Sequence, residues 1–160
     1  MKTRIFSIVC ENVPGVMMCI SRDFTRRQIN LDSITVGIEP SGLARIIIMF
    51  KADDRLAEFM RRVLVRITPV IDVEVLDPER SIVREVALLR THKLNDEESL
   101  RVLNEIDRIG GRVLEFKNNA LVAEVYGDPD RIEQVVEALG PGILKKVARS
   151  GRVLISRNAE

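Results

Sequence analysis

The stretch Glu11-Asn12-Val13-Pro14-Gly15-Val16 decides how the first part of the chain folds, because it joins an apolar run to an amphipathic run. The apolar run, Arg4–Cys10, predicts a strand, and the run after it predicts a helix. Proline fits the first position of a helix, since its φ is already helical and its missing N–H would be unpaired there. We therefore expect the helix to begin at Pro14, with Asn12 beside the cap, where its side chain can accept from a free N–H.

The same turn is suited to an anionic ligand. Gly15 places no Cβ over the exposed start of the helix, so a ligand can approach the backbone closely. Free N–H groups and the positive end of the helix dipole favour a carboxylate at this position. A well-capped turn without a ligand would use the same residue types, so both interpretations stay open on these six residues.

Composition predicts a globular protein without a strong net charge. The chain has 160 residues, enough for one domain or two small ones, and 46% of them are apolar. The 25 Lys and Arg balance 24 Asp and Glu, so no net field recruits nucleic acid or a membrane. Since we find neither an apolar run long enough to span a membrane nor a secretion signal, we expect a cytoplasmic protein. Cys10 and Cys19 lie among apolar residues, which predicts buried thiols.

The first half of the chain has the order strand, helix, strand, strand, helix, strand. After the first helix we expect strands at 31–38 and 43–51, a helix that Asp53 caps and Pro69 ends, and a strand at 70–76. Apolar residues at helical spacing predict the inner faces of the two helices. They are Val16, Met17, Ile20 and Phe24 in the first, and Leu56, Phe59, Met60, Val63, Leu64 and Ile67 in the second. This order predicts a four-stranded antiparallel sheet with both helices on one face.

After a short linker at Asp77–Arg80, the same order of elements repeats. We expect a strand at 82–90, and then a helix that begins at a capping box of Asn95 and Glu98 and ends at Gly110-Gly111. A hairpin of 112–116 and 120–126 follows. The last helix runs from Asp128-Pro129 to Gly140–Gly142, and a closing strand or hairpin lies at 143–147 and 153–155. The inner faces are predicted to carry Val102, Leu103, Ile106 and Ile109, and then Ile132, Val135, Val136 and Leu139.

The predicted fold class is therefore α+β, with two ferredoxin-like βαββαβ sandwiches in tandem, antiparallel sheets and helices on one face of each. We expect the first domain at residues 1–77 and the second at 78–160. Domains of about 75 residues have small cores, and their sheets have open edges. We therefore expect a homodimer or a larger oligomer.

No catalytic or metal-binding set is apparent. The only histidine, His92, lies at the end of a predicted strand, and the chain has no P-loop, nucleophile elbow or pair of metal ligands at helical spacing. Gly110-Gly111 follows a helix, which is the wrong context for a dinucleotide loop. RNA-recognition domains share this element order, but here the aromatic residues are scattered. We expect no catalytic residue, no metal and no cofactor in this chain, and no nucleic acid or membrane partner.

Several motifs occur in an order typical of one known family. The chain has VCENVPGVM at Val9–Met17, FTRRQINLDSITV at Phe24–Val36, ARI at Ala44–Ile46, VREVALL at Val83–Leu89 and ARSG at Ala148–Gly151. These segments are similar to V-E-N-x-P-G-V-L, F-S-R-R-G-Y-N-I with E-S-L-T-V, S-R-M, V-E-R-E-L-A-L-I and R-T-G or R-S-G. The first half thus resembles an ACT domain, the amino-acid-sensing module of many biosynthetic enzymes. Nearly the whole chain resembles the small, regulatory subunit of acetohydroxyacid synthase (acetolactate synthase).

The resemblance implies a chain that does no chemistry itself. Small subunits of this family activate a catalytic large subunit, which holds thiamine diphosphate, Mg²⁺ and FAD and joins pyruvate to a second 2-oxo acid. They also make it sensitive to feedback inhibition by valine, in branched-chain amino-acid biosynthesis. Their ACT domains pair side by side in dimers, with valine at the interface.

Carried onto this sequence, the resemblance implies an effector site at the first turn. The N–H groups of Gly15 and Val16 would bind the carboxylate of valine, and Asn12, with Asn30 of the partner subunit, would accept from its ammonium group. Met17 and Leu31 would line the pocket. In a pocket of this kind, two ligands that differ by one methylene differ in binding free energy by only about 1–3 kcal/mol, so leucine and isoleucine would compete with valine. The predicted effector-binding residues are Asn12, Pro14, Gly15, Val16, Met17, Asn30 and Leu31.

The chain departs from the family pattern at three positions. Cys19 stands where the family usually has arginine, and Phe59 and Val63 stand where it usually has glutamines. These departures remove polar groups, and they put the choice of effector and the contact with the large subunit in doubt. A stand-alone ACT-domain amino-acid sensor, or a divergent paralogue with another effector, therefore stays open as an alternative.

Overall fold

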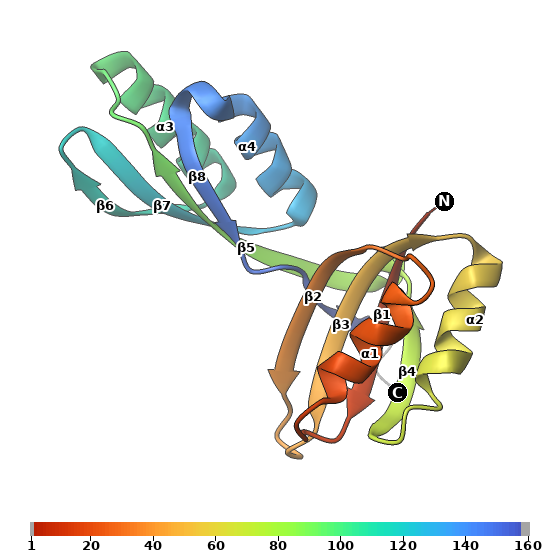
Figure 1. Cartoon of the computed structure of the whole chain (residues 1–160). Coiled ribbons are helices and arrows are strands. Elements are labelled where there is room, and N and C mark those ends of the chain that lie inside the picture. Colours follow the sequence, from red (N-terminus) through yellow and green to blue (C-terminus); the bar gives the residue numbers. More distant parts are fainter. Residues whose placement is uncertain (1, 158–160) are drawn as a thin grey trace. The chain divides into compact units, whose positions relative to one another are not determined.

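The computed structural model describes residues 2–157 and forms two compact units (Figure 1). The first unit extends from the N-terminal end to Ile82 and also takes in the segment from Leu154 onward, whereas the second is Val83–Val153. The chain therefore passes between the units twice. The expected linker is an ordered turn, the 3₁₀ helix η1 (Pro78–Arg80), because the side chain of Asp77 accepts from the N–H of Glu79 at 3.0 Å.

The first unit has a four-stranded antiparallel sheet with both helices on one face (Figure 1). Its strands are β1 (Lys2–Cys10), β2 (Leu31–Ile38), β3 (Ala44–Ala52) and β4 (Val70–Leu76), in the order β2-β3-β1-β4, and its helices are α1 (Val16–Thr25) and α2 (Asp54–Leu64). The core between sheet and helices includes Phe50, whose ring packs edge-on against Phe6 and Phe24 at 4.9 and 5.1 Å between centroids. The predicted fold class is confirmed here.

The other face of the first sheet is partly covered by the end of the chain. Ile5, Ile47, Met49 and Leu76 form a small buried cluster, and Leu154 packs against it. Leu154 belongs to β9 (Val153–Ser156), which pairs with β5 (Ser81–Thr91). The segment expected at the close of the second domain thus contributes to the first unit instead.

The second unit repeats the architecture. β5 is central in the order β6-β7-β5-β8, with β6 (Arg112–Lys117), β7 (Ala120–Gly127) and β8 (Leu144–Arg149), and the helices are α3 (Asp96–Ile109) and α4 (Pro129–Ile143). The predicted capping box of Asn95 and Glu98 is present, with hydrogen bonds of 2.8 and 2.9 Å. Asn118 and Asn119 adopt φ of 53° and 62°, the left-handed values that a two-residue hairpin turn requires.

Two predicted core residues lie outside the core. Phe59 and Leu103 were expected in the core, but both are more than 40% exposed because they lie at the margins of the apolar stripes of α2 and α3. The helix stop predicted at Gly140–Gly142 is present as a break in α4, because Gly140 has a non-helical φ of 64° and ψ of 177°, and a short last turn follows it to Ile143.

Candidate functional site

The turn after β1 differs from the expected helix start. α1 begins at Val16, and Pro14 lies in the turn before it rather than at the first helical position. Gly15 is the N-cap residue and has a φ of 90°, a left-handed conformation in which a Cβ would be strained. The expected cap by Asn12 is also wrong, since no side chain caps α1 and Asn12 is exposed.

The start of α1 presents backbone donors to open space. The first hydrogen bond of the helix joins the N–H of Cys19 to the carbonyl of Gly15 at 3.0 Å. The N–H groups of Val16 and Met17 precede it and therefore have no acceptor within the helix. An ideal Cβ on Gly15 would meet no heavy atom within 4 Å. The first turn of α1 has no acidic side chain, so nothing there offsets the positive end of the helix dipole.

The predicted site residues differ in exposure. Asn12, Pro14, Gly15 and Asn30 are exposed. The side chain of Val16 is buried in the core, so only its N–H group is available to a ligand. Met17 and Leu31 are partly buried and pack against the same core.

The register of the sheet separates these residues into two groups. Cys10, which leads into the turn, pairs with Ala44 at one end of the sheet. Leu31 pairs with Phe50, six residues further along β3, which is about 20 Å at 3.3 Å per residue. The turn and the Asn30-Leu31 pair therefore lie at opposite ends of the sheet. The structure does not bring them together within one chain.

The edge strand β2 carries an apolar row that the sequence analysis did not single out. Ile34, Val36 and Ile38 are 39%, 50% and 58% exposed and pair with residues whose side chains face the helices. Met18 of α1 is 72% exposed. β2 pairs only with β3 among the described residues. An exposed apolar row on an open edge is a candidate contact surface, and the alternation of apolar and polar residues in LDSITVGI was the signal in the sequence that could have found it.

Arg45, from the ARI motif, organises the opposite face of this sheet. Its guanidinium donates to the hydroxyl of Ser7 at 2.6 Å and to the carboxylate of Glu39 at 2.5 Å. Ser7 is buried at 1% exposure, so this bond satisfies a hydroxyl that water does not reach. The motif therefore has a structural role next to β1.

The positions that depart from the family pattern are on or near the helix layer. The guanidinium of Arg27 lies over the exposed ring of Phe59, 5.1 Å from its centroid. Cys19 and Val63 are partly buried. Only Cys10 is a buried thiol, and burial raises its pKa.

Among the described residues we also looked for a metal site and for a membrane-spanning helix. Residues 2–157 contain no group of three or more His, Cys, Asp or Glu side chains that could hold a metal ion. His92 is exposed, and its backbone N–H bonds the carbonyl of Ile143 at 2.9 Å. No helix in this part of the chain is long and apolar enough to cross a membrane.

Comparisons with known proteins match both halves of the chain. The family described as "AHAS small subunit-like ACT domain" matches residues 6–72, and "Small subunit of acetolactate synthase" matches residues 84–158. The probable acetolactate synthase small subunit of Methanothermobacter thermautotrophicus is 33% identical over 98% of this chain and 94% of its own length. That of Mycobacterium bovis is 29% identical over 98% and 93%. The crystal structure of the small subunit from Thermotoga maritima superposes with a TM-score of 0.89, at 28% identity and full coverage of both chains.

Proposed function

Because this chain belongs to the family of acetolactate synthase small subunits, we propose that it is the regulatory partner of the catalytic large subunit of that enzyme. In this proposal it raises the activity of the large subunit and makes it sensitive to valine, in branched-chain amino-acid biosynthesis in the cytoplasm. Thiamine diphosphate, Mg²⁺ and FAD belong to the large subunit, and this chain holds none of them.

The proposed effector site rests on the separation of the turn from Asn30 within one chain, because residues so far apart can line one site only if two copies contribute to it. Ile38 lies at the end of β2 nearest the turn, because it pairs with Ala44, the partner of Cys10. Two copies joined along β2 by a two-fold axis run these strands antiparallel. Each copy then places its Asn30 end beside the Ile38 end of the other. The apolar row on β2 supports this edge as the dimer contact.

The proposed site binds valine by its charged groups and its side chain. The N–H groups of Gly15 and Val16 donate to the carboxylate, at the positive end of α1. Asn12 and Asn30 of the partner subunit accept from the ammonium group. Pro14 holds the turn, and Met17 and Leu31 provide apolar contacts. Leucine and isoleucine compete with valine for the same site, because one methylene changes the free energy of binding in an apolar pocket by only about 1–3 kcal/mol.

Regulation requires that valine bind one arrangement of the enzyme more tightly than another. A site built from two copies provides this, because valine binds only when the two ACT domains are correctly paired. Valine thereby favours one geometry of the dimer. The large subunit senses that geometry through its contact with the dimer.

The test is isothermal titration of the full chain with valine, leucine and isoleucine. Gly15→Asp and Gly15→Ala both place a Cβ at a φ of 90°, so they share the backbone strain, and only the aspartate adds a negative charge. We expect the alanine variant to retain weakened binding and the aspartate variant to lose it. Equal loss in both would remove the evidence for the carboxylate position. No heat from any ligand with the parent chain would contradict the site.

Mixing two defective variants tests whether the site is shared. In a mixed dimer of Gly15→Asp and Asn30→Ala, one of the two sites combines an intact turn with an intact Asn30. Random exchange of subunits should therefore restore about a quarter of the sites. A site contained within one chain would regain none.

A further inference from the structure

β8 forms an open edge of the second sheet. In the order β6-β7-β5-β8 it pairs only with β5 among the described residues, so the backbone groups along its outer side lack a strand partner. Such an edge can accept an extended segment of another chain. Backbone hydrogen bonds then supply affinity, and the side chains on either face supply specificity.

An apolar groove follows this edge on the helix side. It lies between α4 and β8 and has a volume of about 480 Å³, within the range of ligand-binding clefts. Its apolar lining comes from Val136, Pro141, Leu144 and Val147, and the charged residues Glu137, Lys145 and Lys146 also border it. Gly140 also lines it, and the break in α4 at this residue redirects the last turn of the helix beside the strand. The groove can take side chains that point inward from an added strand.

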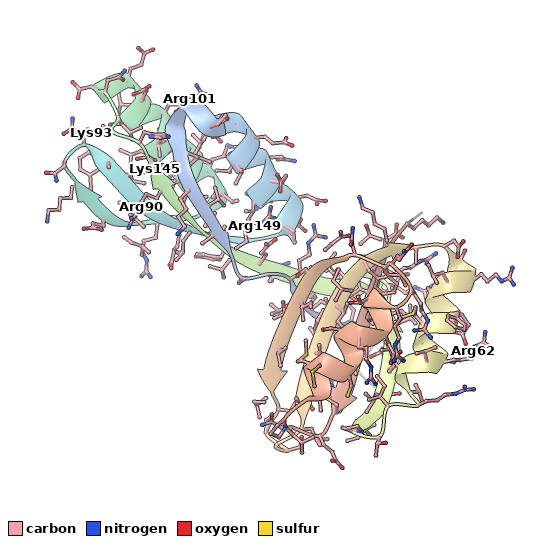
Figure 2. The ribbon with its side chains drawn as sticks, viewed as in Figure 1. Arg62, Arg90, Lys93, Arg101, Lys145 and Arg149 are labelled. Carbon is pink, nitrogen blue, oxygen red and sulfur yellow. The ribbon has the colours of Figure 1, made fainter. Side chains whose placement is uncertain are left out.

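The opposite face of the same edge is cationic. Arg90 on β5 and Lys146 on β8 stand directly opposite each other in the register, an arrangement that is unfavourable for like charges. Lys145, labelled with Arg90 in Figure 2, lies at the register shift beside them. Arg90 and Lys145 line one hollow together with Lys117 and a single carboxylate, that of Glu115. Arg90, Lys145 and Lys146 are exposed, and none of them forms an ion pair with another described residue. These cations are available to carboxylates from outside.

We propose that β8 binds an extended acidic segment of the catalytic large subunit, which adds to the sheet as a further strand. Side chains of an added strand alternate between the two faces. Those on the helix side enter the groove, and those on the other side lie next to Lys146 and Arg90. The segment that fits has apolar residues alternating with Asp or Glu. This inference rests on the proposed partnership with the large subunit.

The charges on β8 disfavour a second copy of this chain as the occupant. An antiparallel self-pairing centred on Val147 would place Lys145 opposite Arg149. Lysines on an edge strand also oppose edge-to-edge association. An acidic segment instead neutralises the unpaired cations.

The experiment is hydrogen exchange of the full chain, alone and bound to the large subunit of the same organism. We expect the amides of β8 to exchange at least about tenfold more slowly in the complex, with no change on β6. Lys146→Glu should weaken binding of the large subunit about fivefold at low salt. Lys51→Glu, the same exchange at an exposed lysine on β3 of the first unit, is the matched control and should change binding by less than about twofold.

The outcomes separate this inference from the proposed function. A complex that forms without protection of β8, and that Lys146→Glu leaves unchanged, overturns the inference but not the partnership. Failure of the parent chain to bind the large subunit overturns both. Protection of β8 that rises with the concentration of the chain alone identifies a second copy as the occupant and also overturns the inference.

Discussion

Arg149 on β8 holds the carboxylate of Glu85 on β5 through two hydrogen bonds, Nε to Oε1 at 2.7 Å and Nη2 to Oε2 at 2.9 Å. Glu85 is only 4% exposed. Arg149 also donates to Glu133 on α4 at 2.5 Å. The hydrogen bonds that Arg149 donates to Glu85, and to a smaller extent to Glu133, raise the pKa of the guanidinium, which therefore stays charged. The three side chains tie the sheet of the second unit to its helix layer.

Replacing Arg149 should destabilise the chain strongly. Arg149→Met removes both hydrogen bonds and leaves the Glu85 carboxylate buried without its counter-ion, so we expect a loss of about 2–4 kcal/mol in the free energy of unfolding. Urea unfolding at fixed chain concentration measures it. Arg112→Met is the control, because its ion pair with Glu124 is 71% exposed on the arginine side and should contribute less than about 1 kcal/mol. Equal losses in the two variants would contradict a special role for Glu85.

Asn12→Ala should affect binding and not stability. Asn12 is exposed and forms no cap, so its replacement should change the free energy of unfolding by less than about 0.5 kcal/mol while weakening the binding of valine. Asp53→Ala is the contrasting variant, because Asp53 caps α2 by accepting from Leu56 N–H at 2.7 Å. Its loss should cost about 1 kcal/mol and leave binding intact. Thermal unfolding and titration of both variants distinguish the two roles.

The buried thiol of Cys10 should make the free energy of unfolding fall at alkaline pH. Burial raises the pKa of the Cys10 thiol above its unfolded value of 9.0. Its contribution to stability is therefore complete below that pH and is lost as the pH rises through the folded pKa, because only the unfolded chain ionises readily. Between pH 8 and about 10 the parent chain should lose more stability than Cys10→Ala. Cys19, which is only partly buried, should react first with a thiol reagent.

Gly111→Ala should be costly although its φ is unremarkable. An added Cβ would lie 2.7 Å from the carbonyl oxygen of Glu124 and 2.9 Å from Val125, so the hairpin or α3 must shift. We expect a loss of about 1–3 kcal/mol. Gly142→Ala is the control, since nothing lies within 4 Å of its Cβ, and it should be neutral or stabilising by up to about 1 kcal/mol. A melting temperature that drops as much in the control would contradict the steric explanation.

The difference between two adjacent residues of α2 tests where the core ends. Met60 is fully buried, so Met60→Ala should cost about 2–5 kcal/mol. Phe59 is 44% exposed and contacts Arg27 mainly through its ring, so Phe59→Ala should cost about 1 kcal/mol. Urea midpoints for the two variants give the comparison. A larger loss for Phe59 would place it in the core after all.

Local chemistry explains which features the sequence could predict. The caps at Asp53, Asn95 and Asp128 depend on residues within three positions of each other, and all three are present. The predicted helix start at Pro14 is wrong because proline and glycine are both common where a helix begins, and only the path of the chain decides which of them takes that position. Helical spacing located the apolar stripes of α2 and α3 but not where each stripe ends, and for this reason Phe59 and Leu103 were wrongly placed in the core.

Long-range features needed the structure. The placement of Asn30 opposite the turn follows from strand register, which links residues that no local pattern connects. The return of Leu154 to the first unit depends on the pairing of β9 with β5. Both features bear on the proposed site, since the first is the reason for proposing a site shared by two copies and the second covers part of one face of the sheet that carries the turn.

The return of Leu154 also determines how the chain responds to cutting. Cleavage at Asp77–Arg80 severs only one of the two passages of the chain between its units. The C-terminal fragment still contributes Leu154 to the cluster on β1, β3 and β4, so we expect the two fragments to stay associated after the cut. An N-terminal fragment expressed by itself would expose that cluster to water and tend to aggregate. Genetic dissection at this position would therefore underestimate what the first unit can do in the intact chain.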